Sequence, residues 1–193
     1  MFLEAVDKTP DLDEDKKIDY KAQAQFLIAY YHYLLARCYG PIILIKETPD
    51  INTTVDSYAH RAPYDECVQW ICDKLDAAAA DLPERRDQIQ YGLATSVAAK
   101  AVKAKMLLYA ASPLFNERAP ELFKNLRDPD NGTQLMPTAY DANKWVKARE
   151  AIKEAIDIAE QNGYHLYNKQ DRFIGEAGKN QYPAAGPVRC LRL

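Results

Sequence analysis

The residues from Tyr64 to Asn116 constrain the fold most, because they predict two helices separated by a polar connection. Over 64–82, apolar residues recur at steps of three and four, which places them on one face of a helix. Pro83 ends this run. A second helix is predicted over 95–112, where Thr95 is the expected N-cap and a proline follows the last turn. The two helices are expected to pack antiparallel, and the stripe of the first comprises Val68, Ile71, Cys72, Leu75, Ala79 and Leu82.

A third helix is predicted over 18–39, before this pair. Its apolar residues extend nearly all round the helix, so we expect neighbours to cover more than one of its faces inside a helical stack. Gly40 is its natural C-terminal stop. Ile42 to Ile45 follow as a short buried strand or extended segment.

A fourth helix is predicted over 141–162, with Asp141 as N-cap and Gly163 as the residue that ends it. Its apolar stripe keeps helical spacing and comprises Trp145, Ala148, Ile152, Ala155, Ile156 and Ala159. The opposite face is expected in solvent and carries Lys144, Lys147, Lys153, Glu154, Asp157 and Glu160. Helix pairs of this kind are typical of tetratricopeptide-like stacks, in which each pair packs against its neighbours. The sequence therefore predicts an all-α chain with long loops and one short extended segment.

Two loops stand out, over Pro49–Arg61 and Pro113–Ala139. The second is rich in proline, aspartate, asparagine and glycine, and loops of such length are usually functional or disordered. It is the candidate ligand surface within the chain and offers Phe115 or Phe123 to a ligand. Aromatic rings in or beside loops can also stack on a sugar; these are Tyr58, Tyr140 and Tyr182. The pattern assigns none of them to ligand binding, so the ligand-binding residues stay unknown.

The charge of the chain gives no reason to expect a nucleic-acid partner, since 27% of its 193 residues are charged and the net charge is −3. No stretch approaches the roughly 20 apolar residues of a membrane helix. The N-terminal residues lack the basic start, apolar centre and cleavage site of a signal peptide. Taken alone, this predicts a cytoplasmic protein. The alternative is a piece of a longer secreted chain, which the irregular sequence after Tyr167 favours.

No residue pattern predicts catalysis, a cofactor or a metal. The sequence holds no nucleophile elbow, phosphate loop, dinucleotide fingerprint or zinc-protease motif. The histidines share no ligand spacing and the cysteines include no CxxC pair, so we expect no zinc site, and buried thiols in place of a disulfide framework. These residues are His32, His60, His165, Cys38, Cys67, Cys72 and Cys190.

Two acidic segments are interpreted as solvated structure. The first is predicted to be a solvated tail and contains Asp7, Asp11, Asp13, Glu14 and Asp15. The second, from Asp128 to Gly132, resembles a fragment of a calcium loop, but Ala139 stands where such a loop needs its glutamate. A turn is therefore the preferred interpretation.

Four ordered blocks of sequence cover roughly residues 18–167. The first block reads KAQAQFLIAYYHYLLARCYGPIILI and the second reads RAPYDECVQWICDKLDAAAADLP. The third reads YGLATSVAAKAVKAKMLLYAASPLFN and the fourth reads YDANKWVKAREAIKEAIDIAEQNGYHLY. In this order and spacing the four blocks resemble the SusD/RagB family, and Gln25 and Leu93 stand where that family often has arginine.

The resemblance implies a non-enzymatic outer-membrane lipoprotein, lipid-anchored in its full-length form. Such a protein acts as the surface lid of a SusC-type TonB-dependent transporter and captures glycans or, in some branches, peptides. The resemblance also implies that the chain is an internal or truncated piece, because these proteins carry an acylated N-terminal cysteine and a longer C-terminal part. We expect an acidic tail over 1–17, a SusD-like helical repeat domain over 18–167 and an irregular, truncated C-terminal tail over 168–193.

Two other functional classes remain open at this point. One is a helical-repeat scaffold that binds a protein partner through a concave face. The other is a small all-helical enzyme, which would need a pocket with convergent titratable groups. Gene context separates the first from a SusD-like protein, because a scaffold would not be encoded beside a TonB-dependent transporter.

Overall fold

Four long helices form the body of the computed structural model, which describes residues 2–48, 50, 52 and 60–166. They are α2 (Glu14–Tyr39), α3 (Tyr64–Asp81), α4 (Ser96–Ala111) and α6 (Asn143–Gln161). The shorter elements are α1 (Phe2–Ala5), α5 (Ala119–Leu122) and the 3₁₀ turns η1 (Val6–Lys8) and η3 (Gln88–Gln90). These ranges contain no strand, and Arg127 and Gln134 form an isolated antiparallel bridge.

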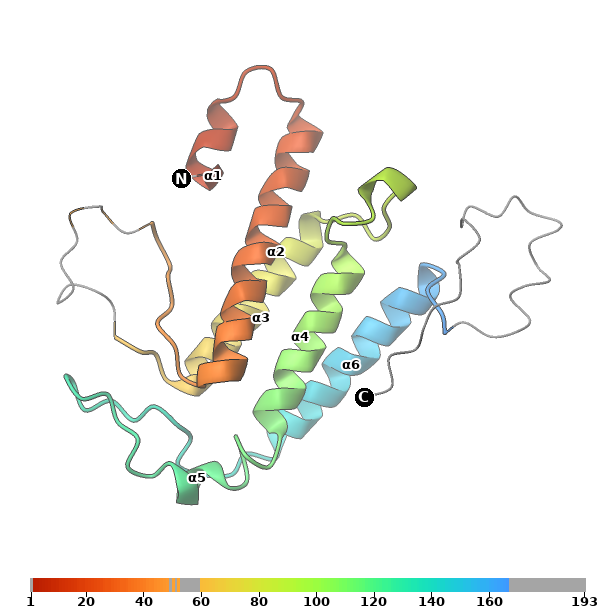
Figure 1. Ribbon diagram of the computed structural model, residues 1–193. Coiled ribbons are helices and arrows are strands. Elements are labelled where there is room, and N and C mark those ends of the chain that lie inside the picture. Colours follow the sequence, from red (N-terminus) through yellow and green to blue (C-terminus); the bar gives the residue numbers. More distant parts are fainter. Residues whose placement is uncertain (1, 49, 51, 53–59, 167–193) are drawn as a thin grey trace, which may run out of the picture.

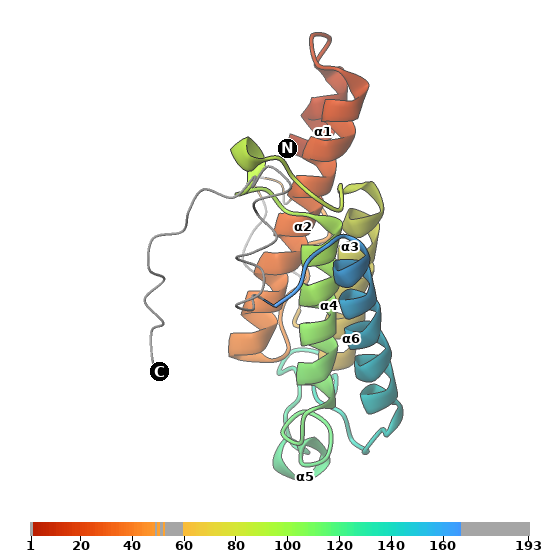
Figure 2. The same ribbon diagram turned by 90° about the vertical axis from the view of Figure 1, so that its right-hand side faces the viewer.

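The long helices alternate in direction and pack in chain order. α2 and α4 run one way and α3 and α6 run the other, so α3 and α4 are antiparallel as predicted (Figure 1). α2 packs on α3, α3 on α4 and α4 on α6, and the last three stand side by side in the turned view (Figure 2). The all-α fold is therefore confirmed, and its order of packing is that of a helical repeat.

The local signals for α3, α4 and the end of α6 are confirmed. α3 and α4 begin and end within one residue of their predicted bounds. The Thr95 side chain caps α4 by accepting a hydrogen bond from the Ala98 N–H at 3.2 Å. Gly163 ends α6 with a φ of 73°, a backbone angle that favours glycine.

Two helix starts differ from prediction. The N-cap position of α6 is Ala142, and Asp141 accepts instead from the Asn143 N–H at 2.9 Å. α2 begins at Glu14, four residues before the predicted start, because the positive end of a helix favours carboxylates in its first turn. The five acidic residues of the predicted tail are exposed, but residues 2–17 also include two short helical turns and the start of α2, and Val6 and Lys17 are buried.

Small residues bring the helices close together, and a few large side chains fill the core. Ala22, Ala29 and Ala36 recur every seven residues on α2, and all three are fully buried. Seven residues are nearly two turns, so these alanines line one face and let α3 approach the α2 backbone. The largest apolar side chains that are fully enclosed are Tyr64, Ile71, Leu75, Met106 and Leu135.

The outer face of α2 is exposed, which contradicts the prediction that neighbours cover this helix on several faces. Leu27, Tyr31, Leu35 and Tyr39 lie at four-residue steps along this face and are 44–71% exposed. The reason is position: α2 stands at one end of the row of helices, and its main packing partner is α3. We call these four residues the α2 stripe.

The segment after α2 is extended, as predicted, but it alternates in burial. Ile42 and Leu44 are buried, whereas Ile43 and Ile45 are more than one third exposed. Its hydrogen bonds go to the helices and the next loop: the Ala62 N–H donates to the Ile42 carbonyl at 2.9 Å. The extended segment is therefore confirmed, whereas the alternative of a short buried strand is wrong.

Candidate binding surfaces

The predicted ligand loop, Pro113–Ala139, is anchored in the helical core. It contains α5 and the Arg127–Gln134 bridge, and Leu135 and Met136 are buried beside the start of α3. The Tyr64 N–H donates to the Leu135 carbonyl at 2.8 Å, which joins the loop to the first turn of α3. The loop is therefore an ordered part of the fold, and its buried residues were not apparent from its polar composition.

Asn116 clamps the two ends of this loop together. Its side chain is fully buried, its Nδ2 donates to the Asp141 carbonyl at 2.9 Å, and its Oδ1 accepts from the Asp141 N–H at 2.9 Å. A single amide thus satisfies both backbone groups of one residue just before α6. This pairing fixes where α6 begins relative to the end of α4.

We expect Asn116→Ala to lower the free energy of unfolding by about 2 kcal/mol, because it leaves both backbone groups of Asp141 without their partner. Asn125→Ala is the matched control, since Asn125 lies in the same loop and is exposed. Urea denaturation followed by circular dichroism measures both. Equal stabilities of the two variants would show that the clamp contributes nothing.

Neither phenylalanine of the loop is presented to solvent as a sugar platform. Phe115 stacks on Tyr64, with ring centroids 4.7 Å apart and planes 12° apart, and Tyr64 is 1% exposed. Phe123 is half-buried and packs against the hydrophobic core. Of the candidate tyrosines, Tyr140 is 53% exposed, while Tyr58 and Tyr182 lie outside the described residues.

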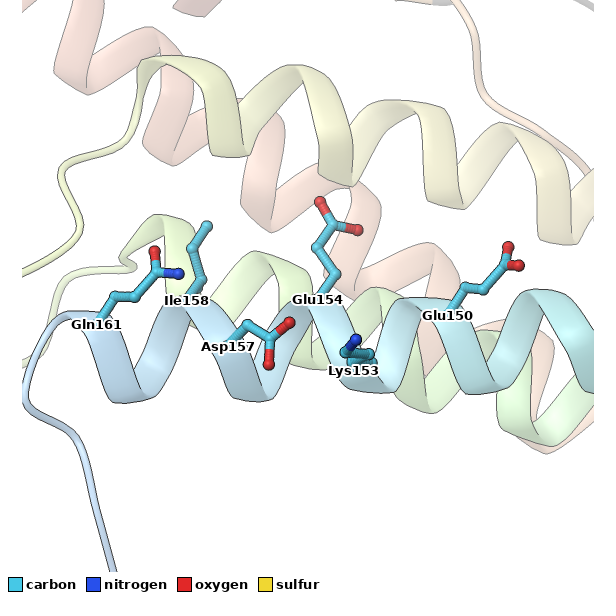
Figure 3. Close-up of a pocket in the computed structure, with 6 residues that line it drawn as sticks. All are labelled: Glu150, Lys153, Glu154, Asp157, Ile158 and Gln161. Atoms are coloured by element: carbon cyan, nitrogen blue, oxygen red, sulfur yellow. The ribbon is translucent and has the colours of Figure 1, made fainter.

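The surface of α6 carries a shallow hollow of about 390 Å³ (Figure 3). All of its lining residues come from this one helix: Glu150, Lys153, Glu154, Asp157, Ile158 and Gln161. The hollow therefore has charges of both signs and no group that converges on it from a second element. It offers neither an aromatic platform for a sugar nor an assembled catalytic site.

The outer face of α6 is mostly in solvent, as predicted, with one correction. Lys147, Lys153, Glu154, Asp157 and Glu160 are exposed. Lys144 is not in solvent: only 12% of its side chain is exposed, and its ammonium pairs with Asp65 at 2.5 Å. It ties the start of α6 to the start of α3. The apolar stripe of α6 is also incompletely covered, since Trp145 and Ile156 are 43% and 50% exposed.

A charged network joins three helices beside this face. Lys100 on α4 pairs with Asp76 on α3 at 2.8 Å and with Glu154 on α6 at 2.7 Å. Lys103 also pairs with Asp76, at 2.6 Å. Burial opposes ionisation of Asp76, but the hydrogen bonds from the two lysines outweigh it and hold its pKa below the usual value. The network orients α3, α4 and α6 relative to one another.

A second network holds the α3–α4 connection against α2. Arg86 forms a bidentate ion pair with Asp19, at 2.8 and 2.5 Å, and also donates to the Ala94 carbonyl. Gln23 on α2 completes the arrangement with two hydrogen bonds to the Ala94 backbone, at 2.9 and 2.8 Å. Only 5% of the Arg86 side chain is exposed. Both networks hold helices and connecting segments together.

The cysteines differ from one another in environment. Cys67 and Cys72 are buried free thiols, as predicted, and burial raises the pKa of Cys72 to about 12. Cys38 is exposed, because it lies toward the open side of α2, so the prediction of a buried thiol is wrong there. Cys190 lies outside the described residues. A raised pKa disfavours the reactive thiolate, so the buried pair is chemically inert.

The histidines also separate into different roles. His32 is a buried structural residue: its Nδ1 lies 2.8 Å from the Ile28 carbonyl, its Nε2 accepts from the Ile45 N–H, and its ring packs on Trp70. His165 is exposed near the end of the described chain. His60 lies beside Asp128 and Asp130, a proximity that the sequence did not predict because these residues are far apart along the chain. Their turn is confirmed, since Asp128 Oδ1 accepts from the Asp130 N–H.

No helix in the described ranges combines the length and the apolar character needed to cross a membrane.

Comparison with known proteins identifies the family. Residues 1–108 match the SusD-like_3 family, which is described as starch-binding and associating with the outer membrane. Among solved structures, BT4246 shares 37% sequence identity with this chain and superposes with a TM-score of 0.77 over 91% of it. A search of curated proteins finds no significant match.

A second solved structure supports the fold at lower identity. It is a SusD-like protein (BF3747) from Bacteroides fragilis NCTC 9343, with 19% identity and a TM-score of 0.60 over 86% of this chain. The chain spans 30% of the length of BT4246 and 25% of the length of BF3747. More than half of the chain matches the family, and its helices superpose on those of a SusD-like protein. The chain belongs to the SusD-like family.

Proposed function

We propose that this chain is the helical-repeat part of a non-enzymatic, SusD-like glycan-capture protein that works at the outer membrane. The observation that carries the proposal is the match of residues 1–108 to a family described as starch-binding and associating with the outer membrane. The α6 hollow agrees with a role without catalysis, because its charged groups come from one helix and none is paired as nucleophile and base.

The proposed contribution of this part is contact with the transporter. Its partner is a SusC-type TonB-dependent transporter, and the contact is made through the charged outer face of α6. Lys147 and Lys153 are exposed there, apart from the ion-pair network that holds the helices together. Exposed charges of this kind govern partner recognition more than they govern the fold.

Charge reversal on α6 tests this contact in the whole protein. We expect Lys147→Glu/Lys153→Glu to reduce the amount of co-purified transporter at least tenfold. The two lysines are proposed to face carboxylates of the transporter, and the substitution turns these attractions into contacts between like charges, which are strongly unfavourable. Lys8→Glu/Lys124→Glu makes the same change of charge on exposed residues away from α6 and is expected to leave co-purification unchanged. Full recovery of the transporter with the α6 variant would refute the assigned face.

The proposal places glycan recognition outside this chain. Sugar sites need aromatic faces and convergent polar groups. Both phenylalanines of the long loop pack within the protein, and the α6 hollow contains no aromatic residue. We therefore propose that residues 1–193 alone bind no glycan measurably and that the ligand site belongs to other parts of a whole SusD-like protein.

One observation favours a second candidate function, that of a protein-interaction scaffold. The α2 stripe presents four large apolar side chains in a line, and such a surface is usually covered by a protein partner or by another part of the same protein. Co-purification also separates the two functions, because a general scaffold would not depend on a TonB-dependent transporter.

A peptide could also take the place of the glycan as the ligand of the whole protein. Titration of peptides as well as polysaccharides into the whole protein tests this alternative.

A further inference from the structure

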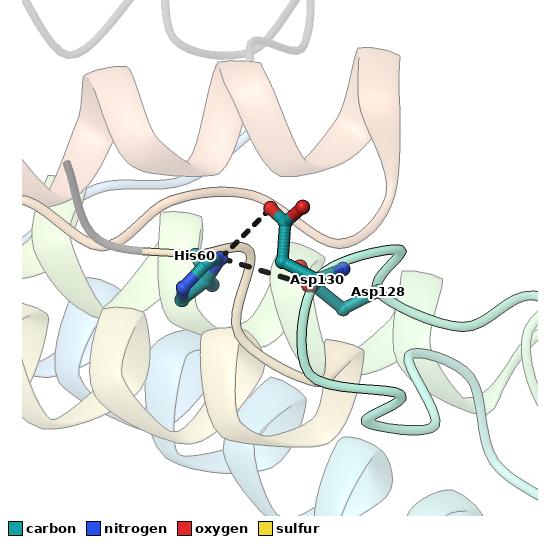
Figure 4. A group of neighbouring side chains, drawn as sticks. All are labelled: His60, Asp128 and Asp130. Carbon is teal, nitrogen blue, oxygen red and sulfur yellow. Dashed lines mark hydrogen bonds and ion pairs between the residues drawn. The ribbon is translucent and has the colours of Figure 1, made fainter. Parts of the chain in front are cut away.

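Three potential metal ligands from two separate loops meet near the start of α3 (Figure 4). His60 lies in the connection before α3, and Asp128 and Asp130 lie in the loop before α6. The His60 Nδ1 atom is 3.6 Å from Asp128 Oδ1 and 3.3 Å from Asp130 Oδ2. One atom from each side chain lies within 4.8 Å of the other two. Figure 4 marks the contacts of the imidazole with both aspartates.

The Asp128 carboxylate is held rigidly and out of solvent. Its side chain is 4% exposed. Its Oδ1 accepts hydrogen bonds from the Asp130 and Asn131 N–H groups, at 3.1 and 3.3 Å. The backbone of the same residue pairs with Thr133, and Gly132 closes the turn with a φ of 72°. In the described part of the chain, His60 is the one basic side chain within 4.0 Å of this carboxylate, and a paired cation favours a carboxylate in a buried position.

His60 is also anchored close by. Two residues after it, the Ala62 N–H donates to the Ile42 carbonyl, and α3 begins at Tyr64. The loop that carries the aspartates is joined to the same turn of α3, through the Tyr64 N–H and the Leu135 carbonyl. Both ligand-bearing segments are therefore fixed to one end of α3. This shared anchor brings ligands together from distant parts of the sequence.

The spacing and the donor types fit a zinc-class ion. Zinc binds imidazole nitrogen and carboxylate oxygen at about 2.0–2.2 Å, so two ligand atoms in a tetrahedral site are about 3.4 Å apart. The separations of the His60 nitrogen from the two carboxylates, 3.3 and 3.6 Å, lie on either side of that value, and the two carboxylates offer oxygens within 4.8 Å of each other. Calcium and magnesium prefer oxygen ligands, whereas an imidazole ligand is typical of zinc and its transition-metal neighbours.

We propose that His60, Asp128 and Asp130 bind a divalent ion of the zinc class, with solvent completing the coordination. The ion would cross-link the connection before α3 to the loop before α6. His60 and Asp130 are 47% and 70% exposed, so the site is accessible from solvent. A bound ion would stabilise the folded chain, because the unfolded chain does not bring these three ligands together.

Calorimetric titration of the full chain with zinc chloride tests the proposal. We expect one zinc ion per chain, and at least a tenfold loss of affinity in His60→Ala and in Asp130→Asn. His165→Ala and Asp157→Asn are matched controls, because each removes an exposed imidazole or carboxylate elsewhere. Asp130→Asn keeps the backbone turn at Asp128, so the result does not depend on a variant that disrupts the loop.

Two further readouts separate this site from other zinc binding. Cobalt bound here should show visible absorption without the intense near-ultraviolet bands of thiolate ligation, which excludes Cys38 as the ligand. Zinc should raise the melting temperature of the wild-type chain and of the controls, and should raise that of His60→Ala by a smaller amount. Absence of zinc binding, unchanged affinity in His60→Ala, thiolate bands from cobalt, or tighter binding of calcium than of zinc would each overturn the proposal.

Discussion

Arg86→Ala is expected to lower the free energy of unfolding by about 3 kcal/mol. The substitution removes a guanidinium whose side chain is 5% exposed and leaves the Asp19 carboxylate, 22% exposed, without its cation. It also removes hydrogen bonds to the Ala94 carbonyl, so the α3–α4 connection loses a main contact with α2. Urea denaturation at neutral pH measures the change.

Two comparisons show whether the ion pair is the cause. Arg149→Ala removes an exposed arginine on α6 and should change stability by no more than about 0.5 kcal/mol. Asp19→Ala should cost much less in the Arg86→Ala background than in the wild type, because the interaction is already lost. Additive effects of the two substitutions would contradict a coupled pair.

The same ion pair predicts a dependence on pH. The hydrogen bonds from Arg86 are the largest cause that holds the pKa of the Asp19 carboxyl below its usual value. A carboxyl with a lowered folded-state pKa contributes stability above its unfolded-state pKa, about 3.9, and that stability is lost as the pH falls through the folded-state pKa. The difference between wild type and Arg86→Ala should therefore be complete at neutral pH and shrink below about pH 4. A difference that stays constant on acidification would contradict this origin.

Leu75→Ala is expected to have a comparable effect, a loss of about 2–5 kcal/mol in the free energy of unfolding. Leu75 lies on α3 in the hydrophobic core and is fully buried. The substitution removes buried apolar surface and leaves a cavity that close-packed helices fill only in part. The measured quantity is the midpoint of urea denaturation together with its slope.

Ile89→Ala is the control for this prediction. Ile89 is 99% exposed in η3, so its truncation should change stability by no more than about 0.5 kcal/mol. Similar losses in the two variants would show that Leu75 does not lie in a cooperative core.

The sequence predicted the helices whose signals are local. α3 and α4 follow from apolar spacing, a threonine cap and terminal prolines, all of which act within a few residues. The start of α2 was missed because an acidic run suits both a solvated tail and the first turn of a helix. The covering of α2 was also predicted wrongly, since the width of an apolar face does not tell how many neighbours a helix has.

The surroundings of the residues at the candidate surfaces depend on contacts between distant parts of the chain, and the sequence predicted them poorly. Asn116 is the last residue of the third block that resembles the family. Its hydrogen bonds to the backbone of Asp141 could not be derived from the sequence pattern. Phe115 appeared available to a ligand because it lies in a polar loop, yet it stacks on Tyr64. His60 and Asp128 share no motif spacing, because two different loops bring them together at the end of α3.

We propose that this chain forms the helical part of a glycan-capture protein, with the sugar site elsewhere in the whole protein. Isothermal titration of a polysaccharide panel, starch included, into the whole protein and into residues 1–193 tests this division directly. We expect saturable binding of a glycan by the whole protein and no measurable heat with residues 1–193. Saturable binding by residues 1–193, or binding of peptides alone by the whole protein, would contradict it.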